Sequence, residues 1–185
     1  MKVTDFNMAQ LLKFSPDTGK LMLGSQRMTI MSARSVGILL EEIYKTGGEN
    51  MARLFFRRWG EVAGRDDARL LKEEYSPDTD MDWIALGPTI HTWEGIVRAV
   101  PTAMEFDRDS GHFFMTGVWE NSFFAEQWLK VIGKSARPVC DILTGYATGY
   151  LSEFFGHDVV AKEPTCIACG DPHCSWEARL KDKWE

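Results

Sequence analysis

Apolar residues recur along this chain at two spacings, one typical of helices and one typical of strands. Residues 18–32 carry turn residues around short apolar runs, which predicts a pair of strands. From Ser32 onward, ARSVGILLEEIYKTGG has apolar residues at near-helical spacing and ends in TGG, a helix stop. ENMARLFFRRWGEVAGRDDARLLKEEY continues as helix, with a break near Gly64 before a shorter charged helix. These segments predict an N-terminal layer of helices and strands.

From about residue 88 the pattern changes to that of strands. IVRAVPTAMEF and HFFMTGVW flank DRDSG, a polar turn of the kind that joins antiparallel strands. FFAEQWLKVIG predicts a helix, and PVCDILTGYATGYLSEFFG predicts a second one, opened by Pro138 in its first turn and closed by Gly156. HDVVAKEPT and CSWEARL predict two more strands on either side of a turn that carries cysteines.

The two patterns together predict an α+β fold, in which an antiparallel sheet is flanked by helices. We expect an N-terminal layer of helices and strands in residues 1–85 and a second domain, ending in a C-terminal hairpin, in residues 86–185. The layer could pack on the rest of the chain or on a second subunit, so it is the candidate dimerisation region. A chain of 185 residues can bury a core in either arrangement.

Composition and charge narrow the range of partners. The formal charge of −6 argues against direct contact with a nucleic-acid backbone. No apolar run approaches the roughly 18 residues of a membrane-spanning helix, and MKVTDFNMAQLLKF lacks the apolar core of a signal peptide. We therefore expect no membrane contact and a cytoplasmic location. GxSxG, HExxH and phosphate-binding glycine loops are absent from the sequence, so we do not expect an enzyme.

The segment EPTCIACGDPHCSW places three of the four cysteines within nine residues. In a reducing compartment, such clusters indicate metal or redox chemistry more often than disulfides. Cys166 and Cys169 form a CxxC pair, but the predicted turn offers no helix N-terminus to lower a thiol pKa. Idle core thiols are the second alternative, and a turn with Gly170, Asp171 and Pro172 does not resemble a core segment. A metal site is the third alternative and the one that we favour.

Zinc takes four tetrahedral ligands, mostly cysteine and histidine and less often acidic residues. Cys166 and Cys174 flank the turn of the predicted hairpin, so their sulfurs can face one point. The other two ligands are left open by the pattern, and the candidates are Cys169, His173, Glu163 and Cys140. His173 is disfavoured because it adjoins Cys174, and adjacent residues on a strand face opposite ways.

Several motifs in order closely resemble a known family. PVCDILTGYATGY and KEPTCIACGDPHC are similar to the 4-vinyl-reductase-type domain. With GKLMLGSQRM, GPTIHTWEG and VWENSF, they resemble the N-terminal sensor of the sigma-54-dependent activators of the phenol and xylene class. The resemblance implies a zinc site formed by Cys140, Glu163, Cys166 and Cys174, with Cys169 outside it. Four protein ligands leave no position for a catalytic water, so this zinc would be structural.

The resemblance also implies an effector pocket. His91 and Trp119 match the histidine and tryptophan that hydrogen-bond the effector hydroxyl in phenol-responsive members. A phenol needs an apolar slot with one or two placed polar groups, and neutral imidazole with indole N–H can satisfy a hydroxyl. A histidine or tryptophan in such segments is more often a packed core residue, but the surrounding motifs favour the site. Xylene-responsive relatives carry tyrosine in place of His91, so we expect a hydroxylated aromatic.

Three residues depart from the phenol-sensing pattern. Gly117 and Ala161 are small where the family has bulky pocket walls, and Trp93 stands where a smaller residue is familiar. We expect these positions to line a pocket of altered shape. The preferred effector would then be bulkier than phenol, either a substituted or a two-ring phenol.

By this resemblance the chain would be the effector-binding part of a transcriptional activator of aromatic catabolism. Effector binding would relieve the repression of an ATPase domain, and this chain has no GxxxxGK[ST] motif of its own. The family also implies a homodimer. The alternative function is that of a stand-alone 4-vinyl-reductase-like protein that binds a tetrapyrrole or another hydrophobic ligand. A protein-binding scaffold of a related fold is a further possibility.

Overall fold

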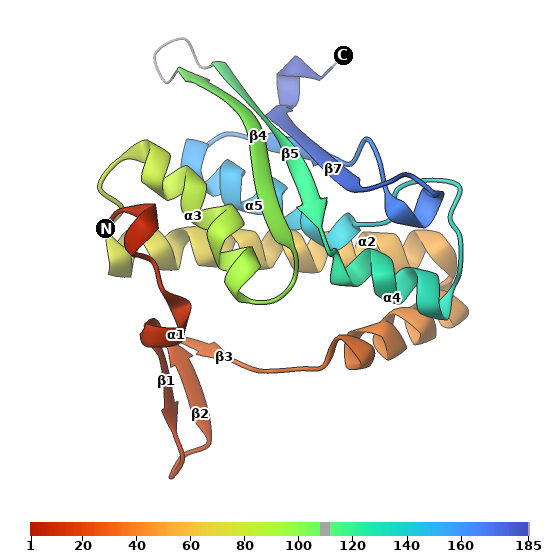
Figure 1. Ribbon diagram of the computed structural model, residues 1–185, viewed down its shortest axis with the longest axis horizontal. Coiled ribbons are helices and arrows are strands. Elements are labelled where there is room, and N and C mark those ends of the chain that lie inside the picture. The colour runs from red at the N-terminus through yellow and green to blue at the C-terminus, as the bar shows by residue number, and fades with distance from the viewer. Residues whose placement is uncertain (108–111, 185) are drawn as a thin grey trace.

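The computed structural model describes residues 1–107 and 112–184. Its strands and longer helices are, in chain order, β1 (Leu12–Ser15), β2 (Lys20–Leu23), β3 (Gln26–Met28), α2 (Ala33–Tyr75), α3 (Asp80–Trp93), β4 (Arg98–Asp107), β5 (His112–Glu120), α4 (Phe123–Val131), α5 (Asp141–Phe155), β6 (Val159–Lys162) and β7 (Cys174–Leu180), with the one-turn helix α1 (Met8–Leu11) before β1 (Figure 1). The described strands form two antiparallel sheets, ordered β1-β2-β3 and β4-β5-β7-β6. The predicted α+β fold is confirmed.

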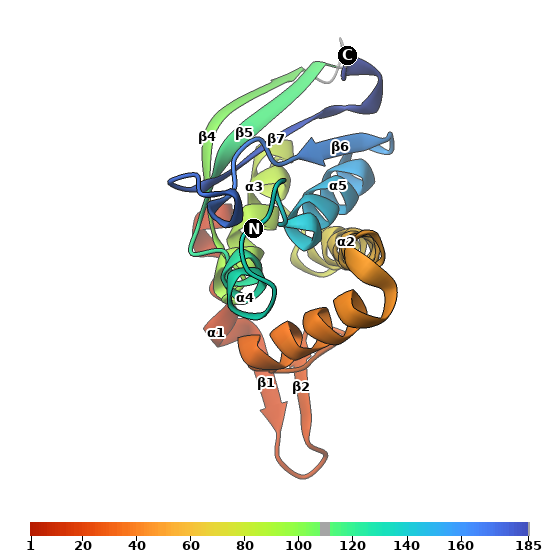
Figure 2. The same ribbon diagram turned by 90° about the vertical axis from the view of Figure 1, so that its right-hand side faces the viewer.

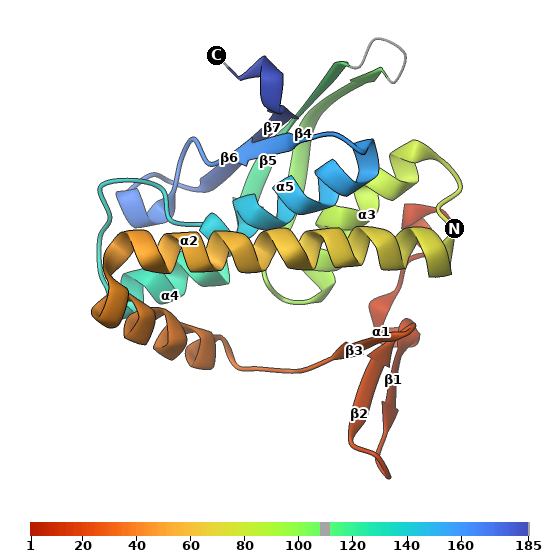
Figure 3. The same ribbon diagram turned by 180° about the vertical axis from the view of Figure 1, so that it is seen from behind.

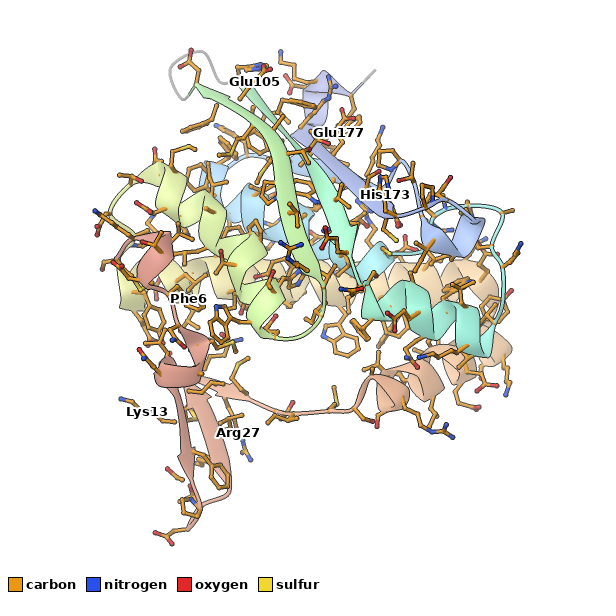
Figure 4. All side chains as sticks on the ribbon, viewed as in Figure 1. Phe6, Lys13, Arg27, Glu105, His173 and Glu177 are labelled. Atoms are coloured by element: carbon orange, nitrogen blue, oxygen red, sulfur yellow. The ribbon has the colours of Figure 1, made fainter. Side chains whose placement is uncertain are left out.

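The four-stranded sheet lies on one side of α5, and α2 lies on the other (Figure 2 and Figure 3). α3 contacts both β4 and α5, so the core lies between the sheet and these helices. The three-stranded sheet projects away from this body, and an extended segment, residues 29–32, joins it to α2 (Figure 1). Lys13 and Arg27 extend from the projecting sheet into solvent (Figure 4). Among the described residues, no helix combines the length and hydropathy that crossing a bilayer requires.

Helices α2 and α5 touch through their backbones. Added Cβ atoms at Gly60 or Gly64 of α2 would overlap carbonyl oxygens of α5, and the same holds in reverse for Gly145 and Gly149. Glycine is required on both faces because any side chain would push the helices apart. The prediction of a helix break near Gly64 is therefore wrong, since this glycine serves close packing within the helical stretch of α2 that follows a kink at Gly48. The stop predicted at TGG is confirmed by Gly48, whose φ is +76°.

Two local predictions differ from the structure in detail, and a third is confirmed. Residues 88–93 are helical rather than strand-like, because α3 continues through Pro88 and is started by Thr79, whose side chain accepts a hydrogen bond from the Asp82 backbone at 3.0 Å. Pro138 lies before α5 rather than in its first turn, and Cys140 is the N-cap. Gly156 closes α5 as predicted, with φ +67°.

The domain division predicted at residue 85 falls inside α3 and stays a prediction. β4 and β5 pair as predicted, with Asp107 opposite His112. In the DRDSG turn predicted between them, residues 108–111 lie outside the described residues.

Replacing Gly149 with alanine should lower the free energy of unfolding by about 2 kcal/mol, because the new methyl group would overlap the Glu61 carbonyl oxygen. Helix propensity alone would favour alanine by about 1 kcal/mol, so the sign of the change separates the two effects. Urea denaturation followed by circular dichroism measures it. Gly47→Ala is the matched control, since its methyl group would meet only the flexible Met51 side chain. A Gly149→Ala variant as stable as the wild type would contradict the close contact.

Candidate functional site

Four possible metal ligands from separate chain segments meet at the start of α5. Cys140 caps α5, and Glu163 directly follows β6. Cys166 lies in the turn that follows, and Cys174 is the first residue of β7. The four ligand atoms lie within 4.8 Å of one another. The sulfur of Cys174 is 3.7 Å from that of Cys140 and 3.8 Å from that of Cys166. We call these four residues the cysteine cluster.

The chemistry of the cysteine cluster fits a cation. Its three thiols are fully buried. One carboxylate oxygen of Glu163 accepts a hydrogen bond from the Cys140 backbone N–H at 2.7 Å, and the other is buried with no partner among the described residues. Burial raises the pKa of the Cys140 thiol and raises the pKa of Glu163 to about 8. A cation would stabilise the deprotonated forms that burial disfavours, so the cluster could hold a metal ion.

The other two candidate ligands lie outside the cluster. Cys169 is partly exposed and belongs to a one-turn helix, Ile167–Cys169. His173 is exposed on the turn before β7, whereas its neighbour Cys174 is buried (Figure 4). The turn itself is fixed by Asp171, whose carboxylate accepts a hydrogen bond from the Cys166 backbone at 2.8 Å.

His91 and Trp119 line one apolar cavity of about 40 Å³, which we call the ring cavity. His91 comes from α3 and Trp119 from β5. The side chains that complete the apolar wall include Ile84, Met115, Leu143, Tyr146, Tyr150 and Trp176. Sequence reasoning missed Tyr146 and Tyr150, although their spacing of four places both on one face of α5.

His91 is held by packing rather than by hydrogen bonds. Its side chain is 5% exposed, and its ring stacks on Tyr146 with 3.6 Å between ring centres. No hydrogen bond joins its ring nitrogens to another described residue. Burial lowers the pKa of His91 to about 3, so the imidazole is neutral at physiological pH. The ring N–H, a hydrogen-bond donor, and the unprotonated ring nitrogen, an acceptor, are therefore both available to a ligand.

The other three predicted pocket residues do not line the ring cavity. Gly117 of β5 and Ala161 of β6 are buried, and Trp93 is 45% exposed at the end of α3. A Cβ on Gly117 would lie 2.7 Å from the Trp176 ring, so this indole takes the space that the small residue leaves. Gly117 and Trp176 are directly paired across β5 and β7. That pairing could not be read from their distant positions in the sequence.

A second cavity of about 320 Å³ adjoins the ring cavity, and we call it the polar cavity. His91 and Tyr146 line both cavities. The other polar residues on its wall are Gln26, Thr29, Asp67 and Glu94, and the rest of the wall is mostly apolar. Sequence reasoning missed Asp67, an acid of α2 that is buried in the structure.

Two family models match the chain. Residues 7–107 match the family described as activator of aromatic catabolism, and residues 115–180 match the domain of the vinyl-4-reductase type. Together these matches cover α1 to β4 and most of β5 to β7, so both cavities and the cysteine cluster lie on matched residues.

Two sequence relatives are transcription regulators. The chain is 30% identical over 172 residues to the phenol regulator MopR of Acinetobacter guillouiae, covering 93% of this chain and 31% of that protein. It is 28% identical over 178 residues to the transcriptional regulatory protein XylR of Pseudomonas putida, covering 96% of this chain and 31% of that protein. The chain therefore spans about a third of the length of either regulator.

A solved structure also matches. The crystal structure of the phenol-responsive sensory domain of the transcription activator PoxR, with phenol, has a TM-score of 0.91 to this structure. The identity is 35%, and the match covers 97% of this chain and 89% of that one. These values place the two chains in one family with one fold.

The neutral state of His91 predicts a pH dependence of stability. Its folded-state pKa of about 3 lies below its ordinary value of 6.5, so the unfolded chain takes up the proton first as the pH falls. The free energy of unfolding of the wild type should therefore fall by about 1 kcal/mol more than that of His91→Gln between pH 7 and pH 5.5. Urea denaturation at both pH values measures the difference.

The exposed His173 supplies the control for this test, since His173→Gln should follow the wild type. Burial raises the pKa values of Asp67 and Glu94, so these acids raise the free energy of unfolding as the pH falls. This contribution is the same in the wild type and in both variants. The difference between variants therefore isolates His91. If the free energy of unfolding fell equally in the wild type and in His91→Gln, the imidazole would not be buried as described.

Proposed function

This chain belongs to the family of activators of aromatic catabolism, and we propose that it is the part of a longer regulator that binds an aromatic effector. The observation that carries the proposal is that His91 and Trp119 line one apolar cavity. A phenolic hydroxyl donates one hydrogen bond and accepts others, and a neutral imidazole with an indole N–H can satisfy both needs. An analogue without the hydroxyl would leave these buried groups unpaired, which gives selectivity.

The ring cavity favours an effector with one ring. Its volume is about 40 Å³, and Trp176 fills the space beside Gly117. Between the two effector sizes left open by the sequence, this argues for a substituted phenol over a two-ring phenol. The relatives are named as regulators, and the PoxR domain is named as phenol-responsive. Those names favour the sensor over a tetrapyrrole-binding protein.

We propose further that the cysteine cluster holds a structural zinc ion. Cys140, Cys166 and Cys174 would bind it as thiolates and Glu163 as a carboxylate, which leaves no open position for substrate. Bound zinc would supply a fixed link between these segments. The ligands would then tie the start of α5 to both ends of the turn between β6 and β7.

We also propose that residues 1–85 form the dimerisation layer. The projecting sheet and the extended segment expose Phe14 at 64%, Ile30 at 88% and Met31 at 57%. A second copy of the chain would bury such apolar side chains. Effector binding would act through a difference in affinity between two arrangements of the dimer, and so relieve the repression of an ATPase domain elsewhere in the regulator. The charge of −6 fits a domain without direct nucleic-acid contact, and we propose a cytoplasmic location.

Metal analysis tests the zinc proposal. The purified chain should contain about one zinc ion, and Cys166→Ser should lose it and melt at a lower temperature, because metal binding and folding are coupled. Cys169→Ser is the matched control, since this thiol lies outside the cluster, and it should keep the metal. Full zinc occupancy in Cys166→Ser would remove Cys166 from the ligand set.

Calorimetric titration with phenol tests the effector site. His91→Ala should weaken phenol binding by about tenfold or more, because the hydroxyl loses a buried partner. His173→Ala, which changes an exposed histidine, should bind as the wild type does. Circular dichroism should report the same fold for all three proteins. Equal phenol affinity in His91→Ala and wild type would remove His91 from the site.

A further inference from the structure

The polar cavity contains two carboxyl groups that the effector site described above does not use. Asp67 is 3% exposed, and its two oxygens accept hydrogen bonds from Gln26 at 3.2 Å and from the Tyr146 hydroxyl at 3.0 Å. Glu94 lines the same cavity from the end of α3. The two acids lie close enough for the charge of Asp67 to raise the pKa of Glu94, which burial and this charge bring to about 8.

No lysine or arginine is among the described residues that line this cavity. The other titratable groups on the wall of this cavity are His91 and Tyr146, and both are neutral at physiological pH because burial lowers the pKa of the histidine and raises that of the tyrosine. Two acids that share a cavity without a cation are costly to ionise together. A ligand that brings a positive charge would relieve this cost.

His91 connects this cavity to the ring cavity. Its buried ring lines both, and no described residue hydrogen-bonds its nitrogens. An aromatic hydroxyl that binds His91 therefore lies at the border of the two cavities. A substituent near that hydroxyl on the ring could extend into the cavity that Asp67 and Glu94 line. The polar cavity, at about 320 Å³, has room for it.

We propose that the polar cavity is a subsite for a basic amine carried by the effector, on a short arm close to the phenolic hydroxyl. The preferred effector is then an aminoalkyl phenol rather than an alkyl phenol. This inference rests on the proposed function, because it assumes that the ring occupies the ring cavity. Glu94 is the group that meets the ammonium, since Asp67 already accepts hydrogen bonds at both oxygens.

The test compares two probes of nearly equal shape. 3-(Aminomethyl)phenol and 3-ethylphenol differ by an ammonium in place of a methyl group, and phenol is the reference. Calorimetry at pH 7 with the wild type should show the amine binding about tenfold tighter than 3-ethylphenol, as expected for a charge-assisted hydrogen bond. The ammonium should also displace the proton that Glu94 holds at this pH, so binding of the amine should release a proton to the buffer. Repeating the titration in buffers with different heats of ionisation measures this proton release.

Glu94→Gln should remove the preference for the amine and leave the affinity for 3-ethylphenol unchanged, which also shows that the variant is folded. Glu42→Gln, which changes an exposed acid of α2, is the matched control and should keep the preference. Any one of three results overturns the subsite: the wild type binds the amine no more tightly than 3-ethylphenol, the preference for the amine survives Glu94→Gln, or binding of the amine releases no proton. If phenol and 3-ethylphenol still bind in those cases, the proposed function stands. If none of the three probes binds the wild type, the proposed function fails and the subsite with it.

Discussion

Direct backbone contact between α2 and α5 is the constraint on which both candidate sites depend. Gly60 and Gly64 of α2 lie against the α5 backbone, and Gly145 and Gly149 of α5 lie against the α2 backbone. The contact fixes α5 in the middle of the molecule, with the four-stranded sheet on its other side (Figure 2). From there α5 begins at the cysteine cluster and lines both cavities along its length. Because α5 is packed rigidly at this position, the cysteine cluster and the two cavities keep fixed positions relative to one another.

Two buried polar sites beside α5 differ in the partners that they find. The polar groups of the cysteine cluster come from several segments and converge within 4.8 Å, which suits a shared cation. His91, in contrast, converges with no polar partner and is kept neutral by burial. An unpaired buried polar group costs about 1–3 kcal/mol, so such a side chain is expected where a ligand supplies the missing partner. The fold thus separates a cluster that suits a shared cation from a side chain whose hydrogen-bonding atoms have no partner among the described residues.

The elements that could be predicted are those defined by short-range pattern. α4, α5, β6 and β7 follow from apolar spacing and from turn residues close to them in sequence. The errors occurred where a residue has two physical uses. Gly64 was interpreted as a helix break, although it serves close packing. Residues 88–93 were interpreted as strand, yet the Thr79 cap and packing against β4 and α5 stabilise α3 through Pro88, a residue type that ordinarily disfavours helix.

By itself the sequence determined the α+β class, the cysteine turn and, through the resemblance, the family to which the chain belongs. Only the tertiary structure decided that Trp176 fills the space at Gly117, that Trp93 lies away from the cavities, and that Asp67 faces the same cavity as Glu94. Spacing and periodicity describe neighbours within a few residues of one another. A cavity wall is made of side chains that are distant in sequence, and it takes shape only when strands pair and helices pack.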